Sequence, residues 1–398
     1  MPKRSSEKSK LLKAASILVA LSFCLGGFFV FSSCKRQEIT EHPQRVEIER
    51  EKELFLGKYD PSNTPEISAK SAILIEISSG EVISAKNADE RLPMASTTKI
   101  MTALVALENC DLKKVISVSP NAVGVEGSSV YLYPNERLTL EDLLYAMLLE
   151  SANDAAAAIA IEIGGSIEGF AQMMNAKATE LGLLHTHFEN PHGLDSATHY
   201  TTARELAIIA RAAYSNEAFR EIVSTYKKTV PLNETEGVRL LINHNKLLKS
   251  YEGATGIKTG FTKKSGRCLV SAAEKDGVGL IAVTLNAPDD WQDHTKLLDH
   301  GFSLIESKVL CEIGEFSYII PAVGGDCDHV KVENAEKVTV LLPRSSAEIE
   351  CKIELPRFLY SPVSSGEVIG RIVFYLNGKE IAHSKLVTST SVTLVNKK

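Results

Sequence analysis

The amino-acid sequence predicts an α+β fold, in which helices cover an antiparallel sheet and an all-helical insert separates the first strands of the sheet from its last. A small all-β domain follows. Three observations predict this fold. A β-hairpin pattern opens the ordered region at residues 72–84. Helical patterns fill the middle of the chain, before a second hairpin pattern at residues 266–285. From about residue 312 onward, short strand patterns alternate with turn residues.

The helical insert is predicted from apolar residues that recur at helical spacing. One helix is expected to start at Ser96. Residues 138–165 are typical of two helices with a break at Ser151, and Thr139 with Asp142 gives an N-cap signature for the first of them. Further helices are expected at residues 167–181, 203–214 and 292–306.

The second hairpin is predicted from two strand patterns that flank Asp276-Gly277, a dipeptide typical of tight hairpin turns. We expect one domain over residues 68–310. A second domain, residues 311–398, is expected from the turn at Asn377-Gly378 and from its strand patterns. These patterns lie at residues 338–342, 349–355, 368–376, 381–387 and 391–395.

The first 34 residues are not expected to belong to the fold. Five basic residues precede residues 14–33, which carry no charge and include long apolar runs. This layout is typical of an export signal, and about 20 such residues also suffice for an uncleaved membrane anchor. Cys34 resembles the lipid-modified cysteine of bacterial lipoproteins, so three alternatives remain open. Each places the rest of the chain outside the cytoplasmic membrane, with the polar residues 35–67 as a linker.

Composition excludes some functions. The chain has 398 residues, 44% of them hydrophobic and 24% charged, which is ordinary globular material for two domains. Its formal net charge of −6 argues against a nucleic-acid partner. Beyond the leader five cysteines remain; a pair between Cys327 and Cys351 is open, but buried, unpaired thiols are the expectation.

Four histidines fall close together without the spacing of a metal site, so we expect neither a metal nor a cofactor and interpret them as loop and core residues. They are His185, His187, His192 and His199.

Three short motifs carry the candidate chemistry. Ser96 and Lys99 stand at i and i+3 of a first helical turn, where a lysine with a depressed pKa can activate a serine. Ser151 and Asn153 fall in the break between two helices, where a hydroxyl can relay a proton and an amide can bind a carbonyl. Each motif alone is more often a helix cap or a plain loop.

The third motif is Lys258-Thr259-Gly260, which occurs once. Its lysine supplies positive charge, its threonine can donate to a carboxylate, and its glycine lets another backbone approach closely. Alone it would be a charged strand end. The occurrence of all three motifs in this order is typical of the three-part active site of penicillin-binding proteins and serine β-lactamases.

The chain resembles the low-molecular-mass penicillin-binding proteins that are serine-type D-alanyl-D-alanine carboxypeptidases, the peptidase S11 group. The segments that carry the resemblance are Pro93-Met-Ala-Ser-Thr-Thr-Lys-Ile-Met-Thr102, Glu150-Ser-Ala-Asn-Asp-Ala-Ala156, Phe188-Glu-Asn-Pro-His-Gly-Leu-Asp195, Thr201-Thr-Ala-Arg-Glu-Leu206 and Gly256-Ile-Lys-Thr-Gly-Phe-Thr262. The resemblance implies a β-lactamase/transpeptidase-like catalytic domain, and it covers residues 68–398, because the β-rich tail also looks like that family's C-terminal domain.

The resemblance also implies roles for single residues. Ser96 would be the acylated nucleophile and Lys99 its general base, while Ser151 would pass protons to the leaving D-alanine. The remaining residues would bind the peptide. Asn153 would bind its backbone, and Lys258 and Thr259, beside Gly260, would bind its terminal carboxylate with support from Arg204. The backbone amides of Ser96 and Phe261 would bind the oxyanion.

The implied substrate is a peptidoglycan stem peptide that ends in D-Ala-D-Ala, and β-lactam antibiotics are the implied covalent inhibitors. The sequence departs from the family in two places. It has no arginine in Val278-Gly279-Leu280, where some members have one, and it stops without the C-terminal amphipathic helix of many members, so we expect any membrane anchor to be the N-terminal segment.

Three alternative functions remain. A class A β-lactamase would carry Glu-x-x-x-Asn between the second and third motifs, and no such pattern lies between Ser151 and Lys258. A D,D-endopeptidase is separable only by substrate. A non-catalytic envelope-binding relative would show degenerate motifs, yet every chemical role has its residue here.

Overall fold

A computed structural model of the chain describes residues 59–60, 62–232 and 237–395. The leader, with Cys34 and the proposed signal or anchor, lies outside the described residues, as does most of the expected linker. Within the described ranges, no helix has both the length and the apolar character needed to cross a bilayer.

The first domain, which extends to α9, is built on a five-stranded sheet in the order β2-β1-β9-β8-β7, and every neighbouring pair is antiparallel. The strands are β1 (Ser71–Glu76), β2 (Val82–Lys86), β7 (Ala254–Thr262), β8 (Gly266–Lys275) and β9 (Val278–Leu285). The two hairpins that the sequence predicts, β1-β2 and β8-β9, therefore lie side by side in one sheet. β7 forms an edge of the sheet, which leaves half of its backbone groups without a strand partner.

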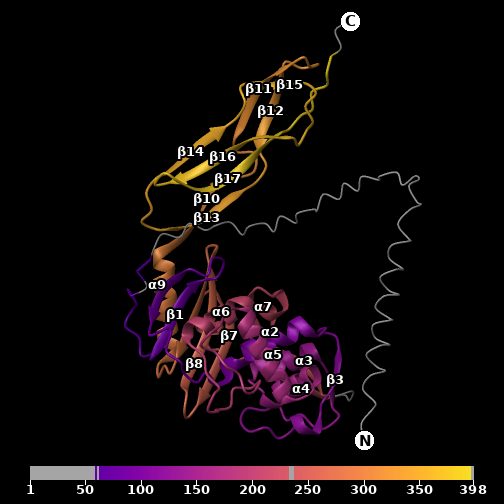
Figure 1. The fold of residues 1–398 in the computed structure, drawn as a ribbon, viewed down its shortest axis with the longest axis vertical. Coiled ribbons are helices and arrows are strands. Elements are labelled where there is room, and N and C mark those ends of the chain that lie inside the picture. The colour runs from indigo at the N-terminus through magenta and orange to yellow at the C-terminus, as the bar shows by residue number, and fades with distance from the viewer. Residues whose placement is uncertain (1–58, 61, 233–236, 396–398) are drawn as a thin grey trace, which may run out of the picture. The chain divides into compact units, whose positions relative to one another are not determined.

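Helices cover both faces of this sheet (Figure 1). Side chains along β1 alternate: Ile73 and Ile75 enter the core shared with the helical insert, whereas Ala72 and Leu74 enter the core shared with α9 (Asp290–Leu304). This alternation explains why β1 is buried along its whole length. The insert consists of α2 (Lys99–Asn109), α3 (Leu140–Leu149), α4 (Asn153–Gly164), α5 (Ile167–Glu180), α6 (Ala203–Tyr214) and α7 (Glu217–Ser224).

Local sequence signals set the ends of these helices. The predicted capping box at Thr139 and Asp142 is present at the start of α3. Helix α4 ends at Gly164 and is capped by Gly165, which has a φ of 74°, and Ser166 then caps α5. A Cβ atom on Gly164 would lie 2.4 Å from the backbone nitrogen of Phe170, so the close turn between α4 and α5 requires glycine there.

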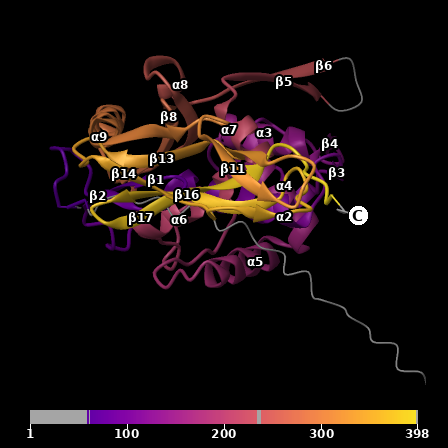
Figure 2. The same ribbon diagram turned by 90° about the horizontal axis from the view of Figure 1, so that it is seen from above.

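Shorter elements complete the insert. The turn η2 (Pro120–Ala122) follows β3 (Val115–Ser117), which pairs with β4 (Arg137–Thr139). The sequence reasoning missed a hairpin of β5 (Lys227–Leu232) and β6 (Gly237–Ile242), which extends beside α3 and α7 (Figure 2). The short helix α8 (Leu247–Ser250) then leads into β7.

The all-β domain has its own core. Helix α9 ends at Leu304, and β10 (Ile305–Cys311) already pairs with β13 (Val338–Pro343). A six-stranded sheet has the order β14-β16-β17-β12-β11-β15. Its strands are β11 (Ser317–Val323), β12 (His329–Asn334), β14 (Ile349–Glu354), β15 (Leu359–Tyr360), β16 (Val368–Leu376) and β17 (Lys379–Thr388). The expected strand at 391–395 makes only single bridges, to Val363 and Gly325.

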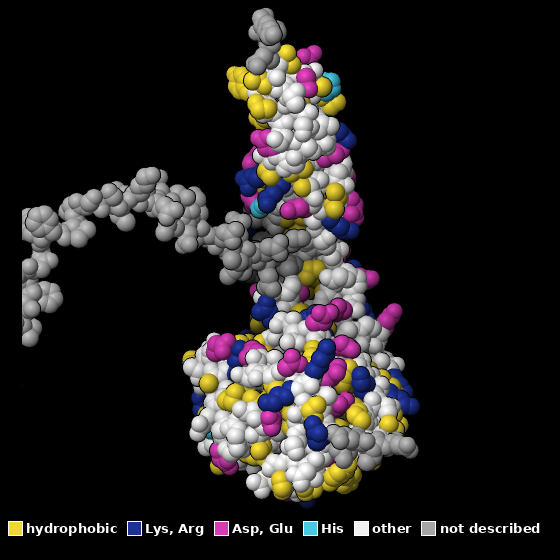
Figure 3. Space-filling model, turned by 90° about the vertical axis from the view of Figure 1, so that its right-hand side faces the viewer, with side chains coloured by type: hydrophobic (Ala, Val, Ile, Leu, Met, Phe, Trp, Pro, Cys, Tyr) yellow, Lys and Arg dark blue, Asp and Glu magenta, His cyan; other side chains and the backbone are white. Residues whose placement is uncertain are grey.

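The surface and the cysteines complete this description. On the face drawn in Figure 3, acidic and basic side chains are interspersed and no basic stripe is visible. All five cysteines in the described ranges are free. Cys268 and Cys311 are buried as expected, whereas Cys327 and Cys351 are exposed, because they lie in a loop and on the edge strand β14.

One buried carboxylate links the start of the first domain to α9. Asp293 accepts hydrogen bonds from the backbone nitrogens of Ser68 and Ala69 and from the Ser68 hydroxyl, at 2.7–2.9 Å. We expect Asp293→Ala to lower the free energy of unfolding by about 3 kcal/mol, because it leaves buried donors unpaired. Urea denaturation measures this, with the exposed neighbour Asp289→Ala as the control. Equal midpoints for the two variants would contradict the expectation.

Candidate active site

The nucleophile candidate lies on a tight turn. Ser96 belongs to the 3-10 turn η1 (Ala95–Thr98), and α2 begins directly after it at Lys99. Ala95 has a φ of 48°, a left-handed conformation that a residue with a side chain rarely adopts. The predicted pairing is present, since Nζ of Lys99 lies 3.0 Å from Oγ of Ser96.

Lys99 is fully buried, and its amine touches three oxygen atoms. Besides Ser96 Oγ, these are Asn153 Oδ1 at 2.7 Å and the backbone oxygen of His192 at 2.6 Å. Burial lowers the pKa of Lys99 well below its usual value, and the nearby charge of Lys258 lowers it further. A neutral amine has two protons and one lone pair. Because the two carbonyl oxygens can only accept, they take both protons, and the lone pair is left for the Ser96 hydroxyl.

The second motif contacts this amine through Asn153. Ser151 follows α3 with a φ of 60° and is 5% exposed, and Asn153 opens α4. The Asn153 side chain bridges two groups: its oxygen accepts from Lys99, and its nitrogen donates to the Glu126 backbone oxygen at 2.5 Å. One amide proton of Asn153 remains for a substrate carbonyl.

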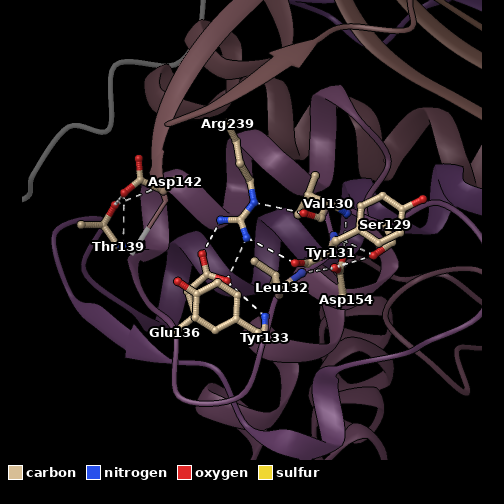
Figure 4. A network of polar contacts seen from close by, with 10 residues as sticks. All are labelled: Ser129, Val130, Tyr131, Leu132, Tyr133, Glu136, Thr139, Asp142, Asp154 and Arg239. Carbon is tan, nitrogen blue, oxygen red and sulfur yellow. Dashed lines mark hydrogen bonds and ion pairs between the residues drawn. The ribbon is translucent and has the colours of Figure 1, made fainter. Parts of the chain in front are cut away.

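Residues 126–136, here called the rim loop, line the site beside Asn153. Asp154, buried next to the second motif, accepts from the Ser129 hydroxyl at 2.6 Å and from the backbone nitrogens of Val130 and Leu132 at 3.3 and 3.0 Å. The Asn153 backbone nitrogen donates to the Ser128 oxygen at 2.7 Å. The rim loop is thus fixed directly to the start of α4 (Figure 4).

A buried ion pair braces the other side of the rim loop. Arg239, from the hairpin β5-β6, binds Glu136 with both terminal nitrogens, and Glu136 is fully buried. The same guanidinium donates to the backbone oxygens of Val130 at 3.0 Å and Tyr131 at 3.3 Å. The sequence reasoning missed Asp154, Glu136 and Arg239; only Asp154, adjacent to a motif residue, carried a signal that could have been found.

The third motif lies on β7, directly against the serine turn. A Cβ atom on Gly260 would come within 3.0 Å of the Ser96 backbone nitrogen, so the strand and the turn touch. Since side chains on a strand alternate, Lys258 faces the same side as Gly260, toward Ser96. Lys258 is 1% exposed, donates to the Thr259 oxygen at 2.9 Å, and burial lowers its pKa to about 7. Phe261 is 65% exposed.

The 189–199 segment holds the two sides together. The Thr102 hydroxyl donates to the Pro191 oxygen at 2.6 Å, and the Thr98 hydroxyl lies 2.8 Å from Nε2 of His199. At the other end, the Thr262 hydroxyl donates to Asp195 at 3.0 Å. A Cβ on Gly193, whose φ is 89°, would clash with the Ala95 oxygen at 1.9 Å, so this position requires glycine.

Among the described residues, no group of three or more His, Cys, Asp or Glu side chains is placed to hold a metal ion, and this includes the four clustered histidines. Burial lowers the pKa of His192 to about 3 and that of His199 to about 4, which keeps both rings neutral. His192 contributes its backbone oxygen to the site, a role that no side-chain motif could have indicated.

Arg204 pairs with an acidic side chain outside the three motifs. Its guanidinium binds Asp89 with Nε at 2.7 Å and Nη2 at 3.1 Å, and the resulting ion pair is exposed. This pairing raises the pKa of Arg204 and lowers that of Asp89. The role of Arg204 at the carboxylate site stays a prediction.

The fold and the site together define the class of the protein. A serine on a tight helical turn, next to a neutral lysine and facing a strand with a second lysine, is the arrangement of active-site-serine acyl-transfer enzymes. Comparison with known families agrees. The family model described as D-alanyl-D-alanine carboxypeptidase, peptidase S11, matches residues 59–289, and the model for the C-terminal domain of penicillin-binding protein 5 matches residues 307–394.

The chain belongs to the peptidase S11 family of serine-type D-alanyl-D-alanine carboxypeptidases. D-alanyl-D-alanine carboxypeptidase DacF of Bacillus subtilis is 33% identical over 340 residues, covering 82% of this chain and 87% of the relative. DacC of Escherichia coli is 32% identical over 347 residues, covering 82% and 85%. The structure of penicillin-binding protein 5 from Haemophilus influenzae matches with a TM-score of 0.60 at 30% identity, over 83% of this chain and 98% of that one.

The lowered pKa of Lys258 predicts a pH dependence of stability. Between pH 7 and 10.5 the unfolded chain keeps a proton that the folded chain has lost, so the free energy of unfolding rises with pH. The slope from this residue is up to about 1.4 kcal/mol per pH unit. We expect Lys258→Met to remove it and to be more stable than the parent at pH 7.

Urea denaturation of parent and variant at several pH values measures this effect. Lys263→Met, which removes an exposed lysine of the same segment, controls for the loss of one positive charge. Parent and Lys258→Met curves that run parallel across the whole range would show that Lys258 is protonated in the folded protein.

Proposed function

We propose that Ser96 carries out the family's reaction as an acyl-enzyme nucleophile, and that the substrate is a peptidoglycan stem peptide that ends in D-Ala-D-Ala. The observation that carries this proposal is the hydrogen bonding of Lys99. Two acceptor-only oxygens fix both protons of its neutral amine, which leaves the lone pair directed at Ser96 Oγ, 3.0 Å away. A general base must lie within such a distance of the proton that it removes.

In the acylation step, Ser96 Oγ attacks the carbonyl carbon between the two D-alanines while Lys99 takes the hydroxyl proton. The backbone nitrogens of Ser96 and Phe261 stabilise the oxyanion. The proton then passes through Ser151 to the leaving amine, and D-alanine departs as the C–N bond breaks. Lys258 and Thr259 bind the terminal carboxylate and keep that bond over the nucleophile.

In the deacylation step, a water molecule attacks the ester carbonyl and gives up its proton to the Lys99–Ser151 pair. The ester bond to Ser96 Oγ breaks, the oxygen regains its proton, and the shortened peptide leaves as an acid. A β-lactam acylates Ser96 by opening of its ring, so no leaving group departs and the acyl-enzyme persists. β-Lactams are therefore proposed as covalent inhibitors, and no metal or cofactor takes part in these steps.

The substrate also indicates where the protein works. Peptidoglycan is cross-linked outside the cytoplasmic membrane, so we propose an extracytoplasmic location at the cell envelope. The apolar residues 14–33 are proposed as the export signal or anchor, and the polar residues 35–67 as the linker to the catalytic part. Intact-mass measurement of the mature protein distinguishes cleavage, retention and lipidation at Cys34.

The proposal predicts that labelled penicillin attaches covalently to the folded protein and fails to attach to Ser96→Ala. The same variant is expected to release no D-alanine from a D-Ala-D-Ala peptide. Gel fluorescence and a D-alanine assay measure the two effects, and Ser119→Ala, in an unrelated Ser-x-Asn, is the control. Equal labelling of Ser96→Ala would contradict the proposal, rapid turnover of penicillin would indicate a β-lactamase, and cleavage of cross-linked peptides alone an endopeptidase.

The role of Lys99 predicts a shifted pH profile in Asn153→Asp. A carboxylate 2.7 Å from the amine would raise the pKa of Lys99 by about 1–3 units, so the base would stay protonated up to a higher pH. Acylation by penicillin should then need a more alkaline pH. Mass spectrometry of the acyl-enzyme against time and pH measures this, with the uncharged Asn153→Ala for comparison. A rate that falls equally at every pH would refute the role of Lys99 as the base.

A further inference from the structure

We propose that Tyr131, on the rim loop, determines substrate specificity by packing against the stem-peptide residue that precedes the two D-alanines. This inference rests on the proposed function of the site. It names a residue outside the three motifs and assigns it to a part of the substrate that those motifs do not contact.

Backbone strain points to Tyr131. Eight residues other than glycine have a positive φ in the described ranges. Five of them are asparagine or aspartate, which tolerate this conformation well. The other three are Ala95, Tyr131 and Ser151. Because Ala95 precedes the nucleophile and Ser151 belongs to the second motif, strain in less tolerant residues is otherwise confined to the catalytic centre, as is typical of functional sites.

The backbone around Tyr131 is fixed on both sides. Its nitrogen donates to Ser129 Oγ at 2.9 Å, and its oxygen accepts from Arg239 at 3.3 Å. The preceding and following nitrogens donate to Asp154, whose neighbour in the chain is Asn153. Side chains from two distant segments therefore hold one strained residue in place.

The side chain of Tyr131 is not stabilised by burial within the protein. It is 85% exposed, the largest exposed fraction among the large hydrophobic residues described. Figure 4 shows its ring turned away from the ion pair of Glu136 and Arg239. A strained backbone that presents an aromatic ring to solvent lowers stability, so the ring is better explained by a contact with a ligand, for which its conformation is already set.

The position of the rim loop indicates which part of the substrate Tyr131 contacts. Lys258 and Thr259 are proposed to bind the terminal carboxylate from the β7 side of Ser96. The rest of the donor peptide is proposed to bind Asn153 through its backbone, and the rim loop is hydrogen-bonded to Asn153. The first side chain beyond the D-alanine pair therefore meets the Tyr131 ring, which suits the aliphatic stem of a diamino acid.

Two matched substrates test this proposal: N-acetyl-D-Ala-D-Ala, which has no preceding side chain, and diacetyl-L-Lys-D-Ala-D-Ala. We expect Tyr131→Ala to lower kcat/KM for the longer substrate by about tenfold, the upper range of an aromatic packing contact. For the shorter substrate kcat/KM should change less than about twofold, and Tyr131→Phe should behave as the parent. An equal loss on both substrates would overturn the proposal.

Tyr131→Gly separates a binding role from a structural one. Glycine accepts a positive φ without strain, so this variant should be at least as stable as the parent. It should nevertheless lose the preference for the longer substrate, as Tyr131→Ala does. If Tyr131→Gly kept the parent's preference for the longer substrate, the proposal would be overturned. Tyr360→Ala controls for loss of an exposed ring elsewhere. Labelling of Ser96 by penicillin is expected in all variants. Its absence in the parent would instead refute the proposed function.

Discussion

The structure depends on one constraint: a lysine amine must remain neutral inside the protein while its lone pair faces a serine. An ammonium group at this depth would cost several kcal/mol of desolvation. The neutral amine avoids that cost only if both of its protons find acceptors. Asn153 and the His192 backbone supply them, so three segments far apart in the sequence have to meet at Lys99. The packing of α2 against α4 and the path of the 189–199 segment follow from this requirement.

For these segments to meet at the Lys99 amine, their backbones must approach one another more closely than side chains usually allow. Gly260 and Gly193 touch the serine turn from two sides, at distances where a Cβ atom would collide or crowd. Ala95 and Ser151 accept left-handed conformations, at about 1–3 kcal/mol each. The surrounding helical core offsets this strain, which explains why so small a site is set in so large an apolar cluster.

The sequence predicts the parts of this structure that leave periodic or spaced signals. Both hairpins of the main sheet, the capping box at Thr139 and the three motifs were predicted, and the structure has the sheet antiparallel as expected. Contacts between distant residues leave no such signal. The pair of Glu136 and Arg239 and the backbone oxygen of His192 could not be predicted for this reason.

Two further differences have physical explanations. The hairpin β5-β6 was missed because exposed apolar residues such as Val238 and Leu240 on its outer face obscure the alternation of a half-buried strand. Arg204 fits a family motif, but the sequence gives no sign of its partner, because Asp89 lies 115 residues earlier in the chain and offers two oxygens to the guanidinium.

The two buried lysines explain how the proton moves in one direction. Burial brings the pKa of Lys258 to about 7, so its charge depends on what lies beside it. In the proposed mechanism, a bound carboxylate favours the charged form of Lys258 and at the same time offsets most of that charge. The pKa of Lys99 then stays low chiefly because the amine is buried. Once Lys99 has taken the proton of Ser96, its buried surroundings favour a return to the neutral amine, so burial favours the proposed transfer of the proton through Ser151 to the departing amine.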